Sequence, residues 1–381
     1  MDFELNPEQR LLKDSVRRFV DKAYGHEARA ALVKSGQGGS AANWQTFADN
    51  GWLAAALPEA FGGLGGSLID TAIIAQELGR GLVIEPWLGC AVLAAQTLVA
   101  AGSAAQNDRL LPMLADGSLR IALAYSELES RGMPTPVSLR AERSLGGYVL
   151  HGRKSLVLGG SQAHAFIVSA AVDGSDGVTL LLVDANAPGL LCQAVPLHDG
   201  SHAAELVFDG VEIAADVLLG EPGGGLPALR EGLAHGIVAL CAEQIGAMEK
   251  AIELTADYLK TRKQFGVPIG SFQVLQHRLA DMAAEMELAR SMLFAALSAV
   301  QNQQGAERQR TLSAAKALIG RAAKSVGGQA IQLHGGIGMT EEYLIGNYFK
   351  RAVVADLLFG SADRHEAACA EALSQAAPYP A

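Results

Sequence analysis

The chain has 381 residues, which exceeds the usual size of one hydrophobic core and predicts two or three packed domains. Half of its residues are hydrophobic and 18% are charged, a composition that excludes a disordered chain. The formal charge of −10 argues against a nucleic-acid partner, because phosphate binding requires clustered Lys and Arg.

The first 119 residues have the pattern of helices. Asn6 can cap a first helix, Pro7 suits its first position, and Gln9 can complete a capping box. Apolar residues at helical spacing predict further helices over 44–57, 68–78 and 88–99, with the turn-rich PEAFGGLGG between the first two of these. We therefore expect an N-terminal helical domain over 1–119.

One uncharged stretch, 86–107, is long enough to span a bilayer. Its polar residues and many alanines make its apolarity modest, so we interpret it as a buried core helix and expect no membrane segment. The N-terminal sequence carries acidic residues and no apolar run typical of a secretory signal. A cytoplasmic location is therefore expected.

The middle of the chain has the pattern of strands. Short β-branched or aromatic segments at 148–150, 166–168, 178–183 and 206–208 are separated by Gly, Asp, Asn and Pro. These segments predict a β domain over 120–224. Helical periodicity returns after it and includes one long helix from Val274 to Leu297, which predicts a C-terminal helical domain over 225–381. The expected class is α+β.

Metal and nucleotide motifs of common kinds are missing. No Gly-rich stretch follows a predicted strand and opens a helix, so GGLGG and HGGIG are interpreted as turns between helices. The histidines form no metal-ligand pattern, and we predict no metal site. The cysteines are far apart and are predicted to be buried thiols: Cys90, Cys192, Cys241 and Cys369.

Two segments of the last third closely resemble the signatures of acyl-CoA dehydrogenases. They are TRKQFGVPIGSFQVLQHRLADM at 261–282 and QLHGGIGMTEEY at 332–343. The resemblance extends to WQTFADNGWLAAALPEAFGGLGG at 44–66 and to QELGR at 76–80, and so covers nearly the whole chain. It implies a helical domain, a middle β-sandwich or barrel domain and a C-terminal four-helix bundle, in the order reached from periodicity.

The family resemblance implies a chemistry. FAD removes a hydride from Cβ of an acyl-CoA while a Glu carboxylate takes the α proton, which gives a 2,3-enoyl-CoA. The implied partners are an acyl-CoA substrate from fatty acid or steroid side-chain degradation, an electron-transfer flavoprotein as acceptor, and further subunits in a tetrameric dimer of dimers. Because the flavin of this family lies across a subunit interface, two different chains hold its two halves.

The C-terminal half of the implied flavin site is well kept. A fixed cation suits the pyrophosphate, amides suit the polar edges, and glycines allow close backbone approach. By resemblance, the cofactor-binding residues are Arg262, Gln264, Phe265, Gln273, Gln332, Gly335 and Gly336.

The half contributed by the β domain is poorly kept. Where the family has a T-E-P-G-A-G-S-D loop, this chain has Ser126–Gly132 and keeps only the first two positions in kind. Where the family has W-I-T beside the flavin ring, this chain has Leu156-Val157-Leu158. A stacking side chain and a hydroxyl donor are both lost.

The catalytic base is absent from both family positions. Phe359 occupies the position before Gly360-Ser361, and Gly236 occupies the alternative position. Neither side chain can take a proton, so we predict no catalytic residue in this chain. Three nearby acids could replace the base, although each is better interpreted as structural or surface: Glu127, Glu231 and Glu243.

Three hypotheses account for these features. In the first, this chain is the non-catalytic subunit of a heteromeric acyl-CoA dehydrogenase and supplies half of the FAD site of its partner. In the second, it is a homo-oligomeric dehydrogenase with a relocated base. In the third, it is a non-redox member of the fold that binds acyl-CoA or a protein.

Overall fold

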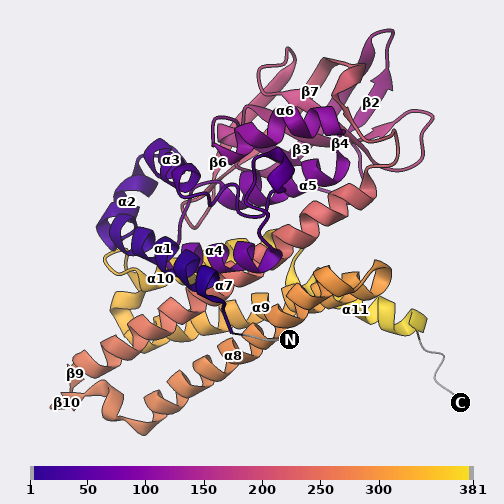
Figure 1. The fold of residues 1–381 in the computed structure, drawn as a ribbon. Helices are drawn as coiled ribbons and strands as arrows, with labels where there is room; N and C mark the ends of the chain where they lie inside the picture. The colour runs from indigo at the N-terminus through magenta and orange to yellow at the C-terminus, as the bar shows by residue number, and fades with distance from the viewer. Residues whose placement is uncertain (1–3, 377–381) are drawn as a thin grey trace, which may run out of the picture. The chain divides into compact units, whose positions relative to one another are not determined.

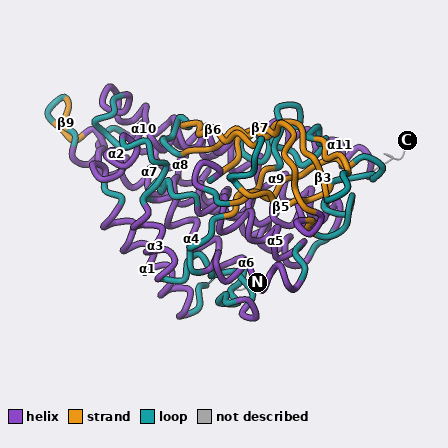
Figure 2. The backbone as a smooth tube through the Cα atoms, turned by 90° about the horizontal axis from the view of Figure 1, so that it is seen from above, coloured by secondary structure: helices purple, strands orange, loops and turns teal. Residues whose placement is uncertain are grey.

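The computed structural model describes residues 4–376 (Figure 1). Helices form the beginning and the end of the chain and strands form its middle, which confirms the predicted α+β class (Figure 2). The predicted domain limits at 119 and 224 stay predictions. By packing, the described residues form two compact units, one of 4–30, 72–83 and 237–376, the other of 31–71 and 84–236.

The first helix begins at its predicted cap. The Oδ1 atom of Asn6 accepts a hydrogen bond from the Gln9 amide at 2.8 Å, and the Gln9 side chain accepts one from the Asn6 amide at 3.2 Å. The predicted capping box is therefore confirmed. The N-terminal helices are α1 (Pro7–Ala23), α2 (His26–Lys34), α3 (Ala41–Asp49), α4 (Leu68–Arg80), a π-helix (Leu88–Ala94), α5 (Ala95–Ala101) and α6 (Ala104–Ala115).

The predicted helix over 44–57 is wrong in extent. Helix α3 ends at Asp49, and Gly51 then adopts a left-handed φ of 73° that starts a series of turns. Trp52 and Leu57 are nevertheless buried. The apolar spacing in this segment therefore correctly indicated which residues are buried, but turns as well as a helix can bury residues at that spacing.

The middle strands form one mixed sheet in the order β6-β7-β3-β2-β4-β5-β8, with β1 parallel to β4. All four predicted strand segments lie in this sheet. Its inward side chains form one apolar cluster that includes Leu150, Phe166 and Phe208. The strands are β1 (Ile121–Ala124), β2 (Arg140–Arg143), β3 (Gly147–Leu158), β4 (Ala165–Val172), β5 (Thr179–Asp184), β6 (Leu190–Pro196), β7 (His202–Ala214) and β8 (Leu218–Leu219).

The prediction of one buried helix over 86–107 is wrong in part: the stretch is largely buried, but it divides into the π-helix, α5 and the start of α6, with residues 103–105 exposed at the break. The π-helix crosses strand β3 so closely that a Cβ on Gly89 would lie 2.4 Å from the Leu158 carbonyl oxygen. Across residues 4–376, no helix has both the length and the apolarity needed to cross a membrane.

The prediction that all four cysteines are buried is wrong for two of them. Cys90 and Cys241 are buried, and Cys369 is partly exposed. Cys192 is exposed because it lies on β6, which is an edge strand paired only with β7.

Five helices form the C-terminal region, and α9 packs against α8, α10 and α11. The predicted long helix from Val274 to Leu297 lies within α8. Between α7 and α8 the chain makes a short hairpin of β9 (Lys263–Gln264) and β10 (Val267–Pro268). The helices are α7 (Leu226–Thr261), α8 (Gln273–Asn302), α9 (Gly305–His334), α10 (Ile345–Leu357) and α11 (Ala362–Ala376).

The QELGR segment forms a close crossing of α4 and α7. A Cβ on Gly79 would lie 2.1 Å from the Glu243 carbonyl oxygen, and a Cβ on Gly246 would lie 1.8 Å from the Gln76 carbonyl oxygen. Only glycine allows this backbone contact. The crossing therefore fixes where α7 runs.

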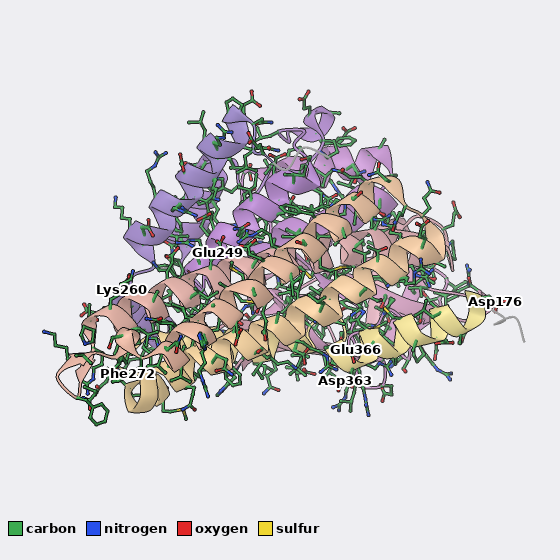
Figure 3. All side chains as sticks on the ribbon, turned by 90° about the horizontal axis from the view of Figure 1, so that it is seen from below. Asp176, Glu249, Lys260, Phe272, Asp363 and Glu366 are labelled. Atoms are coloured by element: carbon green, nitrogen blue, oxygen red, sulfur yellow. The ribbon has the colours of Figure 1, made fainter. Side chains whose placement is uncertain are left out.

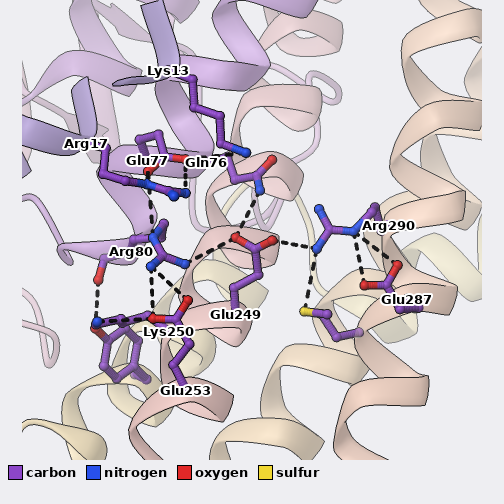
Figure 4. Close-up of polar contacts among 12 residues, drawn as sticks. Lys13, Arg17, Gln76, Glu77, Arg80, Glu249, Lys250, Glu253, Glu287 and Arg290 are labelled. Carbon is purple, nitrogen blue, oxygen red and sulfur yellow. Dashed lines mark hydrogen bonds and ion pairs between the residues drawn. The ribbon is translucent and has the colours of Figure 1, made fainter. Parts of the chain in front are cut away.

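Charged side chains surround this crossing (Figure 4). Arg17 donates to both carboxylate oxygens of Glu77 at 2.8 Å, and the Glu77 side chain is 1% exposed. Arg80 donates to both oxygens of Glu253 at 2.9 Å. Although burial opposes it, the charge of Arg290 2.6 Å away helps hold the pKa of Glu249 below its usual range. Together these ion pairs link α1, α4, α7 and α8.

The crossing predicts the effect of a single methyl group. We expect Gly246→Ala to lower the free energy of unfolding by about 3 kcal/mol, because the helices must separate. Gly328→Ala is the control, since its Cβ would meet nothing closer than 3.8 Å. That variant should gain about 0.5 kcal/mol from helix propensity. Urea unfolding of both variants measures the difference, and equal stabilities would refute the role of the crossing.

Candidate functional site

The first predicted flavin segment is an exposed hairpin. Helix α7 ends at Thr261, and the Arg262 carbonyl then accepts a hydrogen bond from the Ile269 amide at 2.8 Å, which closes the loop. Residues 261–267 are all exposed. Such a projecting hairpin packs little of its own surface, so its residues are available to a ligand or a neighbouring chain.

The tip of the hairpin carries backbone strain. Phe265 has a φ of 54° and Gly266 a φ of 82°, a pair of left-handed residues in which Asn usually takes the place of the Phe. The Phe265 side chain is 91% exposed, with its ring 6.2 Å from the ring of Phe272. Figure 3 labels Phe272 beside this hairpin. An exposed aromatic residue in a strained conformation gains nothing from folding and indicates a binding role.

Four of the predicted cofactor-binding residues have polar side chains without a partner in the described part of the chain. All four are exposed, and within residues 4–376 their side chains make no hydrogen bond or ion pair. They are Arg262, Gln264, Gln273 and Gln332, all predicted cofactor-binding residues. Their donors and acceptors are free for an external group.

The second predicted segment is a turn at the end of α9. Gly335 has a left-handed φ of 64° and begins a 3-10 helix over Gly335–Met339. No atom lies within 4 Å of a Cβ placed on Gly335 or on Gly336. The backbone there is open on one side, as the close approach of a ligand requires.

Aromatic rings bring the two segments together. The His334 ring stacks on Tyr258 at 4.4 Å between centroids and 26° between planes, and lies 5.0 Å from Tyr343. Tyr258 is one turn before Arg262, so the hairpin and the glycine turn start from one cluster. The Arg278 guanidinium also donates to Gln329 at 3.0 Å, which ties α8 to α9.

Sequence reasoning missed these three aromatic residues. His334 lies inside the QLHGG motif and could have been singled out there. Tyr343 ends the same QLHGGIGMTEEY motif, whereas Tyr258 carries no local pattern, and its contact with residues of that motif spans 85 residues of chain to Tyr343.

Phe359 lies in a rigid turn between α10 and α11. It has a left-handed φ of 62° and is 4% exposed. The buried His365 ring contacts the Phe359 carbonyl through Nε2 at 2.9 Å, and buried Lys316 donates to the Gly360 carbonyl at 3.1 Å. The position where the family resemblance places a base therefore lies in a turn held by buried hydrogen bonds, and its side chain is an apolar ring.

The three acids that could replace the base differ in their surroundings. Glu127 is buried and accepts hydrogen bonds from Lys154 at 2.6 Å and from the Leu139 amide at 3.0 Å. Burial would raise the pKa of Glu127, but Lys154 and the amides hold it below its usual value. Glu243 is ion-paired with Arg351. Glu231 keeps a 36% exposed side chain, 3.4 Å from His235.

The β-domain segments expected to lose flavin contacts adopt irregular backbone. Leu156 has a left-handed φ of 51° at a bulge in β3, and its amide donates to Glu205 at 3.2 Å. Leu128 is 82% exposed in the preceding loop. The segments 126–132 and 156–158 contain no aromatic ring, and their side-chain hydroxyls are those of Ser126 and Ser130.

Comparison with known proteins identifies the family. The sequence matches the N-terminal domain of acyl-CoA dehydrogenases over residues 6–118 and their C-terminal domain over 223–374. The chain belongs to the acyl-CoA dehydrogenase family. Its members are oxidoreductases acting on CH-CH bonds, and they bind FAD.

Relatives match along most of their length. A mitochondrial isovaleryl-CoA dehydrogenase of Oryza sativa is 30% identical, over 93% of this chain and 88% of the relative. A chain of the ChsE4-ChsE5 complex of Mycobacterium tuberculosis matches with a TM-score of 0.89 and 26% identity, over 100% of this chain and 100% of the matched chain. A variant of the Tcur3481-Tcur3483 steroid ACAD matches with a TM-score of 0.88 and 30% identity, over 98% of this chain and 99% of that one.

Two features of this acyl-CoA dehydrogenase chain have the chemistry that a diphosphate group requires. The backbone of the glycine turn is open to close approach, and the Arg262 guanidinium is exposed. Among residues 4–376, no group of three or more His, Cys, Asp or Glu side chains could hold a metal ion.

The turn at Phe359 predicts acid sensitivity. Burial lowers the pKa of His365 to about 4, while the unfolded chain has about 6.5. Between these values the unfolded state binds more protons, so stability is full above pH 6.5 and falls by about 3 kcal/mol as the pH drops to 4. We expect the free energy of unfolding, measured by urea titration at several pH values, to fall less steeply from pH 6.5 to pH 4 in His365→Gln than in the unchanged protein. An unchanged slope would contradict this assignment, and exposed His198→Gln is the control.

Proposed function

We propose that this chain is the non-catalytic subunit of a heteromeric acyl-CoA dehydrogenase. In this proposal Arg262, Gln264, Phe265, Gln273, Gln332, Gly335 and Gly336 form half of the FAD site of a catalytic partner subunit. The partner supplies the base and the remaining flavin contacts. The assembly is a dimer of dimers that passes electrons to an electron-transfer flavoprotein.

The observation that carries the proposal is the contrast between two sets of residues. The hairpin and glycine turn are exposed, open and unpartnered, as a surface facing another subunit must be. The base position holds buried Phe359. Dehydrogenation requires a group that takes the α proton of the substrate. A chain that carried out this reaction itself would need an acid at the base position as well as the hairpin and the glycine turn.

The role of each residue is derived from its chemistry. The chemistry that bound FAD supplies in this family is acceptance of the hydride from the substrate Cβ. Arg262 neutralises pyrophosphate charge, and the amides of Gln264 and Gln332 bind polar edges. Gly335 and Gly336 let the dinucleotide approach the backbone.

Two-chain assemblies among the similar structures support this proposal. The ChsE4-ChsE5 complex and the Tcur3481-Tcur3483 steroid ACAD are each named for two proteins. Both match this chain over nearly its full length. By analogy, a substrate with a steroid side chain is the first acyl-CoA to test.

A homo-oligomeric enzyme with a relocated base is the second candidate. It is favoured by Glu231, whose side chain is 36% exposed although it lies 3.4 Å from His235, whereas Glu127 and Glu243 are ion-paired with Lys154 and Arg351. Glu231→Gln in the chain purified alone decides the matter. Loss of acyl-CoA dependent dye reduction in that variant would support this candidate and refute the heteromeric proposal.

Flavin counting tests the first proposal. Purified alone, the chain should carry less than about 0.1 flavin by absorbance, because it supplies only half of each site. Co-purified with the product of an adjacent acyl-CoA dehydrogenase gene, it should give one flavin per two chains, with activity. One flavin per chain in the isolated protein would overturn the proposal.

Two neighbouring cations give a matched pair of variants. Arg262→Ala should weaken FAD binding by the assembly about tenfold, because a charge-assisted hydrogen bond to phosphate is lost. Lys260→Ala, also an exposed cation, should leave it unchanged. If Arg262→Ala and Lys260→Ala weakened FAD binding equally, Arg262 would act only through the overall positive charge of this surface.

The strained tip of the hairpin gives a test with opposite readouts. Asn tolerates the left-handed conformation, so Phe265→Asn should raise the free energy of unfolding by about 1 kcal/mol. The same change should lower flavin occupancy of the assembly several-fold through lost packing. Leu145→Asn, at a fully exposed leucine away from the hairpin, should change neither. Full occupancy in the Phe265 variant would remove Phe265 from the proposed site.

A further inference from the structure

We propose that His334 is a positioning residue, and that its ring, stacked on Tyr258, aligns the Arg262 hairpin with the Gly335–Gly336 turn. This inference rests on the proposed function, because the aligned segments form the proposed FAD half-site. It adds a residue that does not itself touch the dinucleotide and assigns it an effect on flavin affinity.

The hydrogen bond of His334 fixes its tautomer. Its Nδ1 atom lies 2.8 Å from the Ala330 carbonyl oxygen, which can only accept, so Nδ1 carries the proton. The residue is 3% exposed, and burial lowers its pKa, which favours the neutral ring. In this tautomer Nε2 is an acceptor, and it has no hydrogen-bond partner among residues 4–376.

The ring cannot rotate freely. Tyr258 from α7 covers one side of it at 4.4 Å, and Tyr343, which follows the glycine turn, lies 5.0 Å away. The Nδ1 hydrogen bond fixes the remaining torsion by attaching the ring to its own helix. The three rings therefore hold the last turn of α7, the last turn of α9 and the segment at Tyr343 in one arrangement.

This arrangement matters because the half-site is assembled from separate pieces. Arg262 and Gln264 follow α7, whereas Gln332 and the glycines end α9. No hydrogen bond or ion pair of their side chains joins the two pieces within residues 4–376. The Tyr258–His334 stack is the ring contact that sets their spacing, and a shift of about 1 Å in such a site is costly.

Two variants at one position separate stacking from hydrogen bonding. His334→Phe keeps an aromatic ring against Tyr258 and removes the buried acceptor that lacks a partner. It should keep the FAD Kd of the flavin-stripped assembly within about twofold and should not lower the Tm. His334→Ala removes the stack and should raise the FAD Kd about tenfold. Fluorescence quenching on adding FAD gives each Kd.

A stability-matched control excludes a merely structural effect. Leu312 is a buried residue near the start of the same helix, so Leu312→Ala should lower the Tm without changing the FAD Kd. If Leu312→Ala and His334→Ala raise the Kd equally, His334 acts through stability and the inference is overturned. It is also overturned if His334→Phe loses FAD as strongly as His334→Ala.

Arg262→Ala in the same titration distinguishes the two proposals. If Arg262→Ala binds FAD normally, the proposed half-site itself fails. If Arg262→Ala weakens binding while His334→Ala does not, the half-site stands and the positioning role fails.

Discussion

The backbone contact between α4 and α7 is the constraint on which the geometry of its unit depends. Two glycines, Gly79 and Gly246, let the helices meet at their main chains, and buried carboxylates paired with arginines surround the contact. Because α7 runs on for 15 residues beyond Gly246 to Thr261, its course decides where the hairpin after it projects. A structural motif of the family is thus the foundation of a binding surface that lies elsewhere in the same unit.

The chain keeps and loses family features in a pattern that packing explains. Glu127 survives from an otherwise altered loop because it compensates the buried charge of Lys154. The turn at Phe359 survives because Lys316 and His365 hold its carbonyl groups, although the residue it presents is no longer an acid. The residues at these positions that match the family signature stabilise the fold, and the proposed function accounts for the absence of the expected base and ring contacts.

The exposed half-site shows the opposite balance. Its hairpin tip is strained, its aromatic ring is in solvent, and its polar side chains have no partner within the described chain. Each of these features costs stability in an isolated subunit. In the proposed assembly, a dinucleotide and another chain would contact this surface, and those contacts would offset the loss of stability.

The sequence by itself determined the class of fold and the identity of the family, because caps, strand composition and the two long motifs are local features. The capping box at Asn6, the four strand segments and the helix over 274–297 needed no tertiary information. The end of α3 at Asp49 was decided by the tertiary structure, since turns buried the apolar residues that helical spacing had grouped. Tertiary packing also decided the exposure of Cys192, the pairing of Glu127 and the stack of Tyr258 on His334. These depend on residues far apart in the chain, whose contact no local pattern encodes.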